Sequence, residues 1–185
     1  IEATTLVTAF LICHHRTPES IEATWKYLII CSVGVAFAFM GTLLAGAAAN
    51  NLHLPPSQAL LWTHLKTHAA DLNPVMMKTA FLFLLVGYGT KAGLAPMHSW
   101  LPDAHSQAPA PVSALFSGFM LNASLYCIMR YMPLAEVATG HAGWSLRLLL
   151  VFGLVSILVA APFIIFQRDV KRLLAYCSVE HLGII

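Results

Sequence analysis

Residues 26–49 form a continuous apolar run in which no charged side chain follows Lys26. In a helix these 24 residues extend about 36 Å, which is enough to cross the hydrocarbon core of a bilayer with some tilt. Similar runs recur along the chain, which is 58% hydrophobic and 10% charged, whereas roughly a quarter of the residues are charged in a soluble domain. We therefore expect an all-α, polytopic bundle of transmembrane helices surrounded by the lipid bilayer. The net charge of +2 and the lack of a basic stripe give no indication of nucleic acid as a partner.

Six helical segments are predicted, and together they form one unit over residues 1–185. The chain begins at Ile1 without an initiator Met and ends in an apolar stretch, so we expect a single fragment of a longer membrane protein. Residues 50–73 are polar and predict a loop with one interfacial helix. The six segments are residues 1–13, 26–49, 75–101, 111–131, 146–167 and 169–185.

The third segment is interrupted by Gly93 and Pro96. Proline removes a backbone donor from the helix, and the carbonyl groups freed near it have no partner in lipid. Such an interruption is tolerated within a membrane only where protein or water surrounds it. The sequence therefore predicts a discontinuous helix, broken near residues 93–96, that has a functional role.

Lys91 lies directly before this break, about two-thirds of the way along an otherwise apolar segment. A lysine at the centre of a membrane costs roughly 2.5 to 3.5 kcal/mol, so it is expected to face the protein interior and to find a partner. Glu2 is the best candidate, because it precedes a clean apolar run in the first segment. Burial disfavours the charged amine and a carboxylate favours it, so such a pair can load and release a proton. The alternative is a lysine that snorkels from a helix end.

Four further polar residues are candidates for a proton pathway. Asn122 lies in the middle of the fourth segment, where its amide can hold water or simply bond helices together. His98 and His105 flank the connection that follows the break, and imidazole can pass protons near neutral pH. His181, inside the last segment, can continue such a relay or lie at a helix end.

Nothing in the sequence predicts a cofactor, a metal site or a redox centre. The four cysteines are scattered without a CxxC motif and are interpreted as small packing residues. His64 and His68 have the spacing of a helical metal pair, but no third ligand accompanies them, and a surface loop is the favoured interpretation. Glycine-rich nucleotide motifs are also absent, so the chain itself is not expected to be catalytic.

Two motifs resemble those of a known family. The stretch 91–115, KAGLAPMHSWLPDAHSQAPAPVSAL, resembles the hallmark of the antiporter-like proton-conducting subunits of respiratory complex I, Mrp antiporters and membrane-bound hydrogenases. The stretch 169–178, DVKRLLAYCS, resembles the second marker of that family. Residues 1–5, 20–27 and 178–183 are most similar to the branch that contains hydrogenase 4 component F and its formate hydrogenlyase relatives.

The resemblance implies an inverted-repeat antiporter-like fold, in which the interrupted segment is the broken helix of one repeat. It implies that Glu2 and Lys91 are the coupled pair, and that His98 is the family's histidine after the break. Asn122 departs from many complex I members, which carry a lysine there, and this favours the hydrogenase branch. The residues with an expected structural role are Gly93, Pro96, Asp103, Asp169, Lys171 and Arg172.

On this basis the expected function is that of a membrane subunit that translocates protons, or sodium, coupled to electron transfer in a hydrogenase-4-like or NADH dehydrogenase-like complex. Its partners are then the other membrane subunits of a respiratory or hydrogenase complex, and the redox chemistry belongs to those subunits. One alternative is a separate cation/proton antiporter or an inorganic-carbon transporter subunit. Another is a passive membrane anchor, which Asn122 alone supports.

Loop charges give a weak indication of orientation. If the first and the last loop share a side, five cations lie on that side and four on the other. Positive residues are enriched in cytoplasmic loops, so the loop at residues 167–172 is expected to face the cytoplasm, in a multi-pass protein of the cell inner membrane. The five cations are Arg16, Lys26, Arg168, Lys171 and Arg172, and the four are Lys66, Lys78, Arg130 and Arg147.

Overall fold

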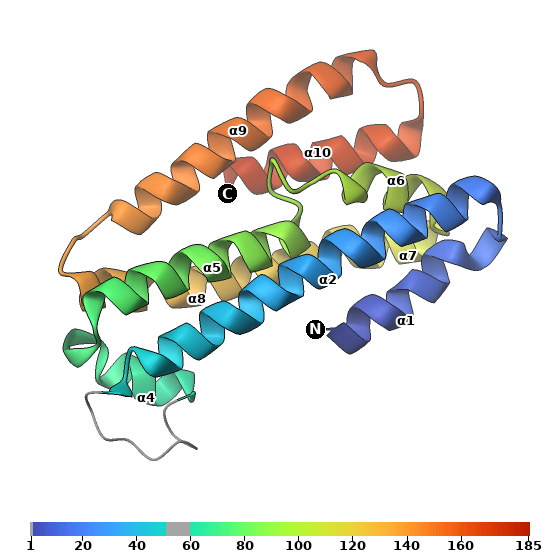
Figure 1. The fold of residues 1–185 in the computed structure, drawn as a ribbon. Coiled ribbons are helices and arrows are strands. Elements are labelled where there is room, and N and C mark those ends of the chain that lie inside the picture. The colour runs from blue at the N-terminus through green and yellow to red at the C-terminus, as the bar shows by residue number, and fades with distance from the viewer. Residues whose placement is uncertain (1, 51–59) are drawn as a thin grey trace.

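The computed structural model describes residues 2–50 and 60–185, with residue 2 described by its backbone alone. All regular structure in these residues is helical (Figure 1). The longer helices are α1 (Glu2–Ile12), α2 (Pro18–Ala47), α5 (Pro74–Ala92), α8 (Leu121–Thr139), α9 (Trp144–Phe166) and α10 (Val170–Ile184). The shorter ones are α4 (Trp62–Thr67), α6 (Trp100–Gln107), α7 (Ala110–Leu115) and a π-helical turn (Phe116–Met120) that joins α7 to α8. The predicted all-α fold class is confirmed.

The start of α2 lies at Pro18 rather than at residue 26, which corrects the predicted boundary. Thr17 caps this end, because its side-chain oxygen accepts a hydrogen bond from the Ser20 amide at 3.1 Å. Pro18 suits the first helical position, where its missing N–H would have no helical partner. Glu19 and Glu22 make these first turns polar, and hydropathy alone does not separate a polar helix end from a loop.

The fourth predicted segment is longer than residues 111–131, because the helix that starts at Ala110 continues through the π-helical turn to Thr139. Pro133 lies inside α8 and does not end it. The helix ends instead at Gly140, whose φ of 64° gives the left-handed conformation typical of a C-terminal cap. Proline is tolerated inside membrane helices when neighbouring groups compensate for the lost backbone bond, and this explains the wrong boundary.

The interruption expected at residues 93–96 separates α5 from α6. Gly93 ends α5 with a φ of 80°, and the Leu94 amide donates to the Gly89 carbonyl at 2.9 Å. Backbone groups near the break are satisfied by other parts of the protein. The Trp100 indole donates to the Thr90 carbonyl at 2.8 Å, and the Ala95 amide donates to the Ser156 hydroxyl on α9 at 3.0 Å. The following segment forms α6, so the connection expected at residues 103–111 is helical up to Gln107.

Glycines permit the closest helix contacts in the structure. A Cβ added at Gly87 on α5 would collide with the backbone nitrogen of Ala38 on α2. A second pair, Gly153 and Gly183, brings α9 and α10 into backbone contact in the same way. Figure 1 shows α2 alongside α5, while α9 and α10 form a separate hairpin.

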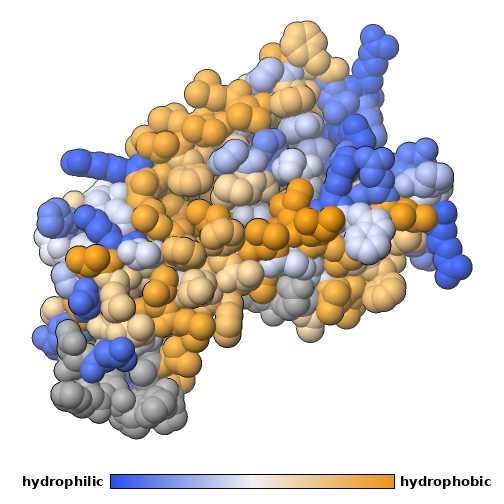
Figure 2. All heavy atoms as spheres, in the orientation of Figure 1, coloured by the Kyte–Doolittle hydropathy of each residue, from blue (hydrophilic) through white to orange (hydrophobic). Residues whose placement is uncertain are grey.

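Within the described residues, three helices are long and apolar enough to cross a membrane. They are α2, the continuous helix Ala110–Thr139 and α9. On the face drawn in Figure 2, hydrophobic residues form a broad band between hydrophilic residues that gather toward two opposite ends. The large apolar side chains exposed on this band have the pattern expected of helices in contact with lipid.

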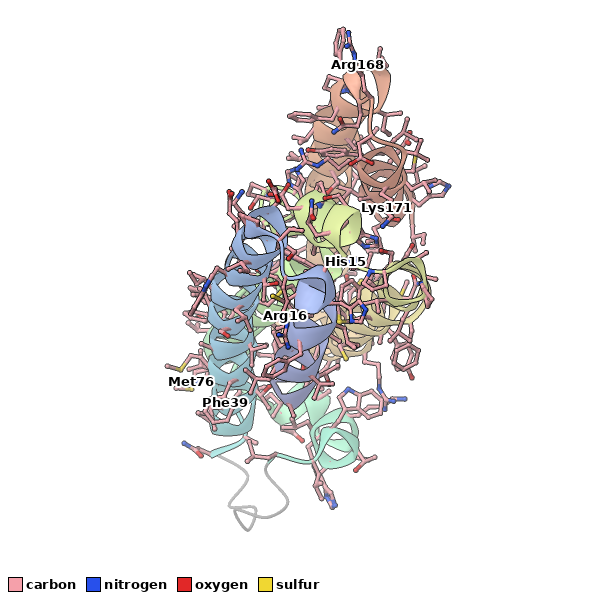
Figure 3. All side chains as sticks on the ribbon, turned by 90° about the vertical axis from the view of Figure 1, so that its right-hand side faces the viewer. His15, Arg16, Phe39, Met76, Arg168 and Lys171 are labelled. Carbon is pink, nitrogen blue, oxygen red and sulfur yellow. The ribbon has the colours of Figure 1, made fainter. Side chains whose placement is uncertain are left out.

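The loop after α1 and the loop before α10 lie at the same end of the bundle. Figure 3 looks onto this end, where His15, Arg16, Arg168 and Lys171 lie. The first and last loops therefore share one side, which is the condition on which the expected orientation depends.

Candidate functional site

Lys91 is buried in the last turn of α5, with 4% of its surface exposed. A cation is electrostatically favoured at this end of a helix, where the carbonyl groups concentrate negative partial charge. The side chain lies among helices and does not extend to the surface as a snorkelling lysine would.

Hydroxyl groups from two other helices hold the Lys91 ammonium. Its Nζ atom donates to the Thr5 hydroxyl on α1 at 2.8 Å and to the Tyr27 hydroxyl on α2 at 3.0 Å. It also lies 4.9 Å from the centre of the Tyr27 ring, within the range of a cation–π interaction. Thr5 and Tyr27 are themselves fully buried, so the ammonium is kept in an environment from which bulk water is excluded.

A third hydroxyl extends this cluster. The Thr8 hydroxyl donates to the Thr4 carbonyl at 2.7 Å, and it lies 2.6 Å from the Tyr27 hydroxyl, where either oxygen can be the donor. Lys91, Tyr27 and Thr8 thus form a connected chain of hydrogen bonds from α5 through α2 to α1.

The sequence analysis missed the hydroxyl groups of this cluster. Thr5 and Thr8 lie three residues apart in an apolar segment, and this spacing places them on one face of α1. That spacing is the one feature of the sequence that could have indicated a polar face on α1. Nothing in the sequence pairs Tyr27 with Lys91. Glu2 lies one turn before Thr5 on α1, but its side chain is outside the described residues, so the Glu2–Lys91 pair stays a prediction.

A cavity of about 350 Å³ adjoins the buried lysine. Thr8, Tyr88, Ser124 and Cys127 line it together with Lys91. Phe116 and several other apolar side chains form the rest of its wall. The cavity is large enough for several water molecules, each of which occupies about 30 Å³ in the liquid.

A second, larger groove lies between α6, α8 and α10 and has a volume of about 610 Å³. Three predicted pathway residues, His105, Asn122 and His181, line it. Ser117 on the π-helical turn and Ser178 on α10 join its two sides through a hydrogen bond of 3.0 Å. The structure therefore brings together polar residues that are far apart in the sequence.

The two histidines that line the groove, His105 and His181, differ in the hydrogen bonding of their ring nitrogens. Nδ1 of His181 lies 2.6 Å from the Cys177 carbonyl, which can only accept, so this nitrogen carries the proton and Nε2 is the acceptor in the neutral ring. His105 is 4% exposed, and its Nε2 is buried without a hydrogen-bond partner among the described residues. Such a nitrogen is suited to a water molecule that completes its hydrogen bonding.

Asn122 is exposed to the groove and bonds within its own helix. Its side-chain amide donates to the Ser117 carbonyl at 3.3 Å and to the Gly118 carbonyl at 3.0 Å, both in the π-helical turn. Asn122 therefore stabilises an irregular turn beside the groove. This is a structural role within one helix, rather than the bond between helices that was the alternative to holding water.

The comparisons with known proteins place these features in a family. The whole chain, residues 1–185, matches the model of the family described as NADH:quinone oxidoreductase/Mrp antiporter, TM. The chain belongs to this family. The resemblance inferred from residues 91–115 and 169–178 is thereby confirmed, and the chain is a multi-pass integral membrane protein of the NADH:quinone oxidoreductase/Mrp antiporter family.

Relatives from hydrogenases support the branch that the sequence suggested. A hydrogenase-4 component F homolog of Methylacidiphilum infernorum (isolate V4) is 46% identical over 185 residues, which are all of this chain and 39% of the relative. Hydrogenase-4 component B of Escherichia coli (strain K12) is 32% identical over 184 residues, and the match covers 26% of it. The chain thus spans well under half the length of the curated relatives it matches.

A solved structure shares the fold. A chain of the membrane-bound sulfane sulfur reductase, an archaeal respiratory membrane complex, superimposes with a TM-score of 0.85 at 28% identity, covering 97% of this chain and 35% of that one. The predicted antiporter-like helix bundle is therefore confirmed.

In this family member the charged residues near residue 103 form a network at one end of the bundle. The Asp103 carboxylate bridges Lys26 on α2 at 3.0 Å and Arg172 on α10 at 2.9 Å. Asp169 caps α10, accepting from the Lys171 amide at 2.9 Å, and the Lys171 ammonium donates to the Ala108 carbonyl at 3.0 Å. These contacts join α2, α6 and α10, as a structural role would require.

The three other histidines singled out in the sequence lie apart from the hydroxyl cluster and the groove. His98 is half-buried beside the Tyr176 ring, at 6.4 Å between ring centres, and lines neither cavity. His64 lies on the short helix α4 and His68 directly after it. In residues 2–50 and 60–185, no group of three or more His, Cys, Asp or Glu side chains is arranged to hold a metal ion.

Proposed function

We propose that this chain is part of a membrane subunit that translocates protons, and that Lys91 is the group that binds and releases them. The subunit is coupled to electron transfer in a hydrogenase-4-like or NADH dehydrogenase-like complex, whose other membrane subunits are its partners. The observation that carries this proposal is the burial of an ammonium group among neutral hydroxyls directly before the helix break.

The surroundings of Lys91 make its charge sensitive to small movements. Taking an ammonium out of water is costly, and the Thr5 and Tyr27 hydroxyls offset part of that cost. A shift of α1 that withdraws the Thr5 hydroxyl destabilises the charged form and favours release of a proton. A neighbouring carboxylate, for which Glu2 is the candidate, favours uptake.

The groove that contains His105 and His181 provides the onward route. Imidazole both accepts and donates protons near neutral pH, and the groove has room for water between these side chains. Asn122 lines this route without storing a proton, because an amide does not titrate in the physiological range.

We further propose that the chain lies in the cell inner membrane with the end that carries Arg16, Arg168 and Lys171 toward the cytoplasm. The excess of cations at this end supports that orientation. Reactivity of a cysteine introduced at Arg168 toward a membrane-impermeant reagent in inverted vesicles, and its absence in right-side-out vesicles, tests it.

The decisive experiment replaces Lys91 with Ala in the intact complex. Proton translocation should be lost, whereas assembly and electron transfer are retained, because Ala removes the titratable group and leaves the helix intact. Lys78→Ala is the matched control, since Lys78 is exposed at the other end of the same helix α5. Normal translocation by the Lys91→Ala complex would reject the proposal and leave a passive membrane anchor as the favoured role.

Translocation measured in vesicles with and without sodium shows whether the transported ion is a proton or sodium. Translocation that proceeds in the absence of sodium supports proton transfer through Lys91. A strict sodium requirement would instead favour the cation/proton antiporter alternative, which the description of the family includes.

A further inference from the structure

Phe116 separates the two polar spaces of the structure. Its side chain is fully buried and forms part of the wall of the cavity beside Lys91. The groove that contains His105 lies beyond it. The wall between a buried ammonium and a buried imidazole is therefore an apolar aromatic ring.

The ring of Phe116 contacts a member of each polar group. Its centre lies 6.0 Å from the Tyr27 ring, with an angle of 25° between the planes, and 5.8 Å from the His105 ring, with an angle of 70°. Tyr27 accepts a hydrogen bond from Lys91, and His105 lines the groove. Between Tyr27 and His105 lies a ring of carbon atoms that cannot pass a proton.

The backbone at Phe116 is irregular. Phe116 is the first residue of the π-helical turn, and its carbonyl accepts from the Leu121 amide. π-Helical turns are rare, less regular than α-helix, and concentrated at functional sites. Ser117, the next residue, bonds to Ser178 across the groove, and Asn122 bonds to the Ser117 carbonyl. A rearrangement of groove side chains is therefore transmitted directly to the residue that carries the barrier.

We propose that Phe116 is a hydrophobic gate that controls water contact between Lys91 and His105. This inference rests on the proposed function, because it assigns a control point to the same proton route. With the ring between Tyr27 and His105 the passage is dry, and an apolar constriction without water does not conduct. When the ring moves aside, water enters and one proton passes from the Lys91 ammonium to the neutral His105 imidazole, leaving a neutral amine and an imidazolium.

The test uses Phe116→Ala in the intact complex, with Phe39→Ala as the control. Phe39 lies on α2, where 65% of its surface is exposed, and it lines neither the Lys91 cavity nor the groove. The first measurement is the rate at which a small charged thiol reagent labels Cys127, which lines the Lys91 cavity, as followed by mass spectrometry of that peptide. The second is the passive decay of a pH gradient across vesicles that contain the complex at rest.

Phe116→Ala should raise the Cys127 labelling rate and the passive proton permeability about tenfold, which corresponds to about 1.4 kcal/mol of barrier. Electron transfer should continue, with fewer protons translocated per electron. Phe39→Ala should leave both measurements near those of the unmodified complex. Unchanged labelling and permeability in Phe116→Ala would overturn the gate.

The labelling measurement separates the gate from the proposed function. Increased labelling in Phe116→Ala together with normal translocation by Lys91→Ala supports the gate and rejects the role of Lys91. Unchanged labelling in Phe116→Ala together with loss of translocation by Lys91→Ala rejects the gate and supports the role of Lys91. If Phe116→Ala does not assemble, Phe116→Leu is measured in its place, and a smaller increase in labelling is expected because Leu fills part of the ring's volume; no increase again overturns the gate.

Discussion

Lys91 uses Tyr27 in two ways, because its ammonium donates to the Tyr27 hydroxyl at 3.0 Å and lies 4.9 Å from the centre of the same ring. The hydroxyl offers a lone pair, and the ring offers the negative face of its π-system. Both contacts favour the charged form of the lysine. Tyr27 therefore stabilises the protonated amine through its hydroxyl and through its ring.

Removing the Tyr27 hydroxyl separates these two contacts. Tyr27→Phe keeps the ring and deletes one hydrogen bond to a charged group, which is worth about 1.5–3 kcal/mol. We expect a lower thermal stability of the intact complex and reduced proton translocation, both measured on the purified, reconstituted protein. Tyr126→Phe, at an exposed tyrosine on α8, should change neither.

Thr5 provides the shorter of the two hydrogen bonds to Lys91. Thr5→Val preserves the shape of the side chain and removes the acceptor, so translocation should fall, whereas Thr79→Val at an exposed position on α5, away from the cavity and the groove, should have little effect. Because both hydroxyls serve one ammonium, the Thr5→Val and Tyr27→Phe losses should not add in the double variant. Strictly additive effects would show that the two hydroxyls do not act on a common group.

His181 and His141 form a natural comparison. Each ring places Nδ1 near a backbone carbonyl of its own segment, at 2.6 Å and 2.7 Å respectively, but only His181 lines the groove. His181→Gln should slow proton translocation, because glutamine does not accept and release protons, while His141→Gln should not. Equal rates in the two variants would exclude His181 from the route.

The contact of Gly87 with Ala38 predicts a strong packing effect. A methyl group at Gly87 would overlap the α2 backbone, and overpacking of this kind costs about 1–3 kcal/mol. Gly87→Ala should therefore lower the melting temperature of the complex. Gly118→Ala is the control, since a Cβ there meets nothing within 4 Å.

Asp103 joins three helices through ion pairs that are partly exposed to solvent. Its side chain is 21% exposed, and those of Lys26 and Arg172 are 45% and 41% exposed. Asp103→Asn should destabilise the protein by about 1 kcal/mol at low ionic strength, because exposed pairs contribute little. The difference in melting temperature should shrink in high salt; a difference that is independent of salt would mean that Asp103 acts through its hydrogen bonds alone.

The sequence was sufficient for the fold class and for the position of the break. Uninterrupted apolar runs predict membrane helices directly, and Gly93 with Pro96 marks the point where the backbone leaves the helix. Helix ends were predicted less well, because Pro18 begins a helix and Pro133 lies within one. The local effect of a proline depends on whether a cap or neighbouring groups compensate for it, and hydropathy does not contain that information.

The candidate site was predicted in part for a similar reason. Lys91 was identified because a charge in an apolar segment is costly wherever the segment folds. The hydroxyl groups that bind it come from α1 and α2. Threonine and tyrosine are common on membrane helices, so the sequence does not single out Thr5 or Tyr27. Three of the predicted polar residues share a groove, but the role of Phe116 depends on its two neighbouring rings and has no counterpart in the sequence pattern.

At Gly87 the backbones of α2 and α5 are in direct contact, and these two helices carry Tyr27 and Lys91. Thr5 and Thr8 lie on a third helix, α1. A displacement of α1 alone would therefore alter the hydrogen bond from Lys91 to Thr5 and leave both contacts of Lys91 with Tyr27 in place.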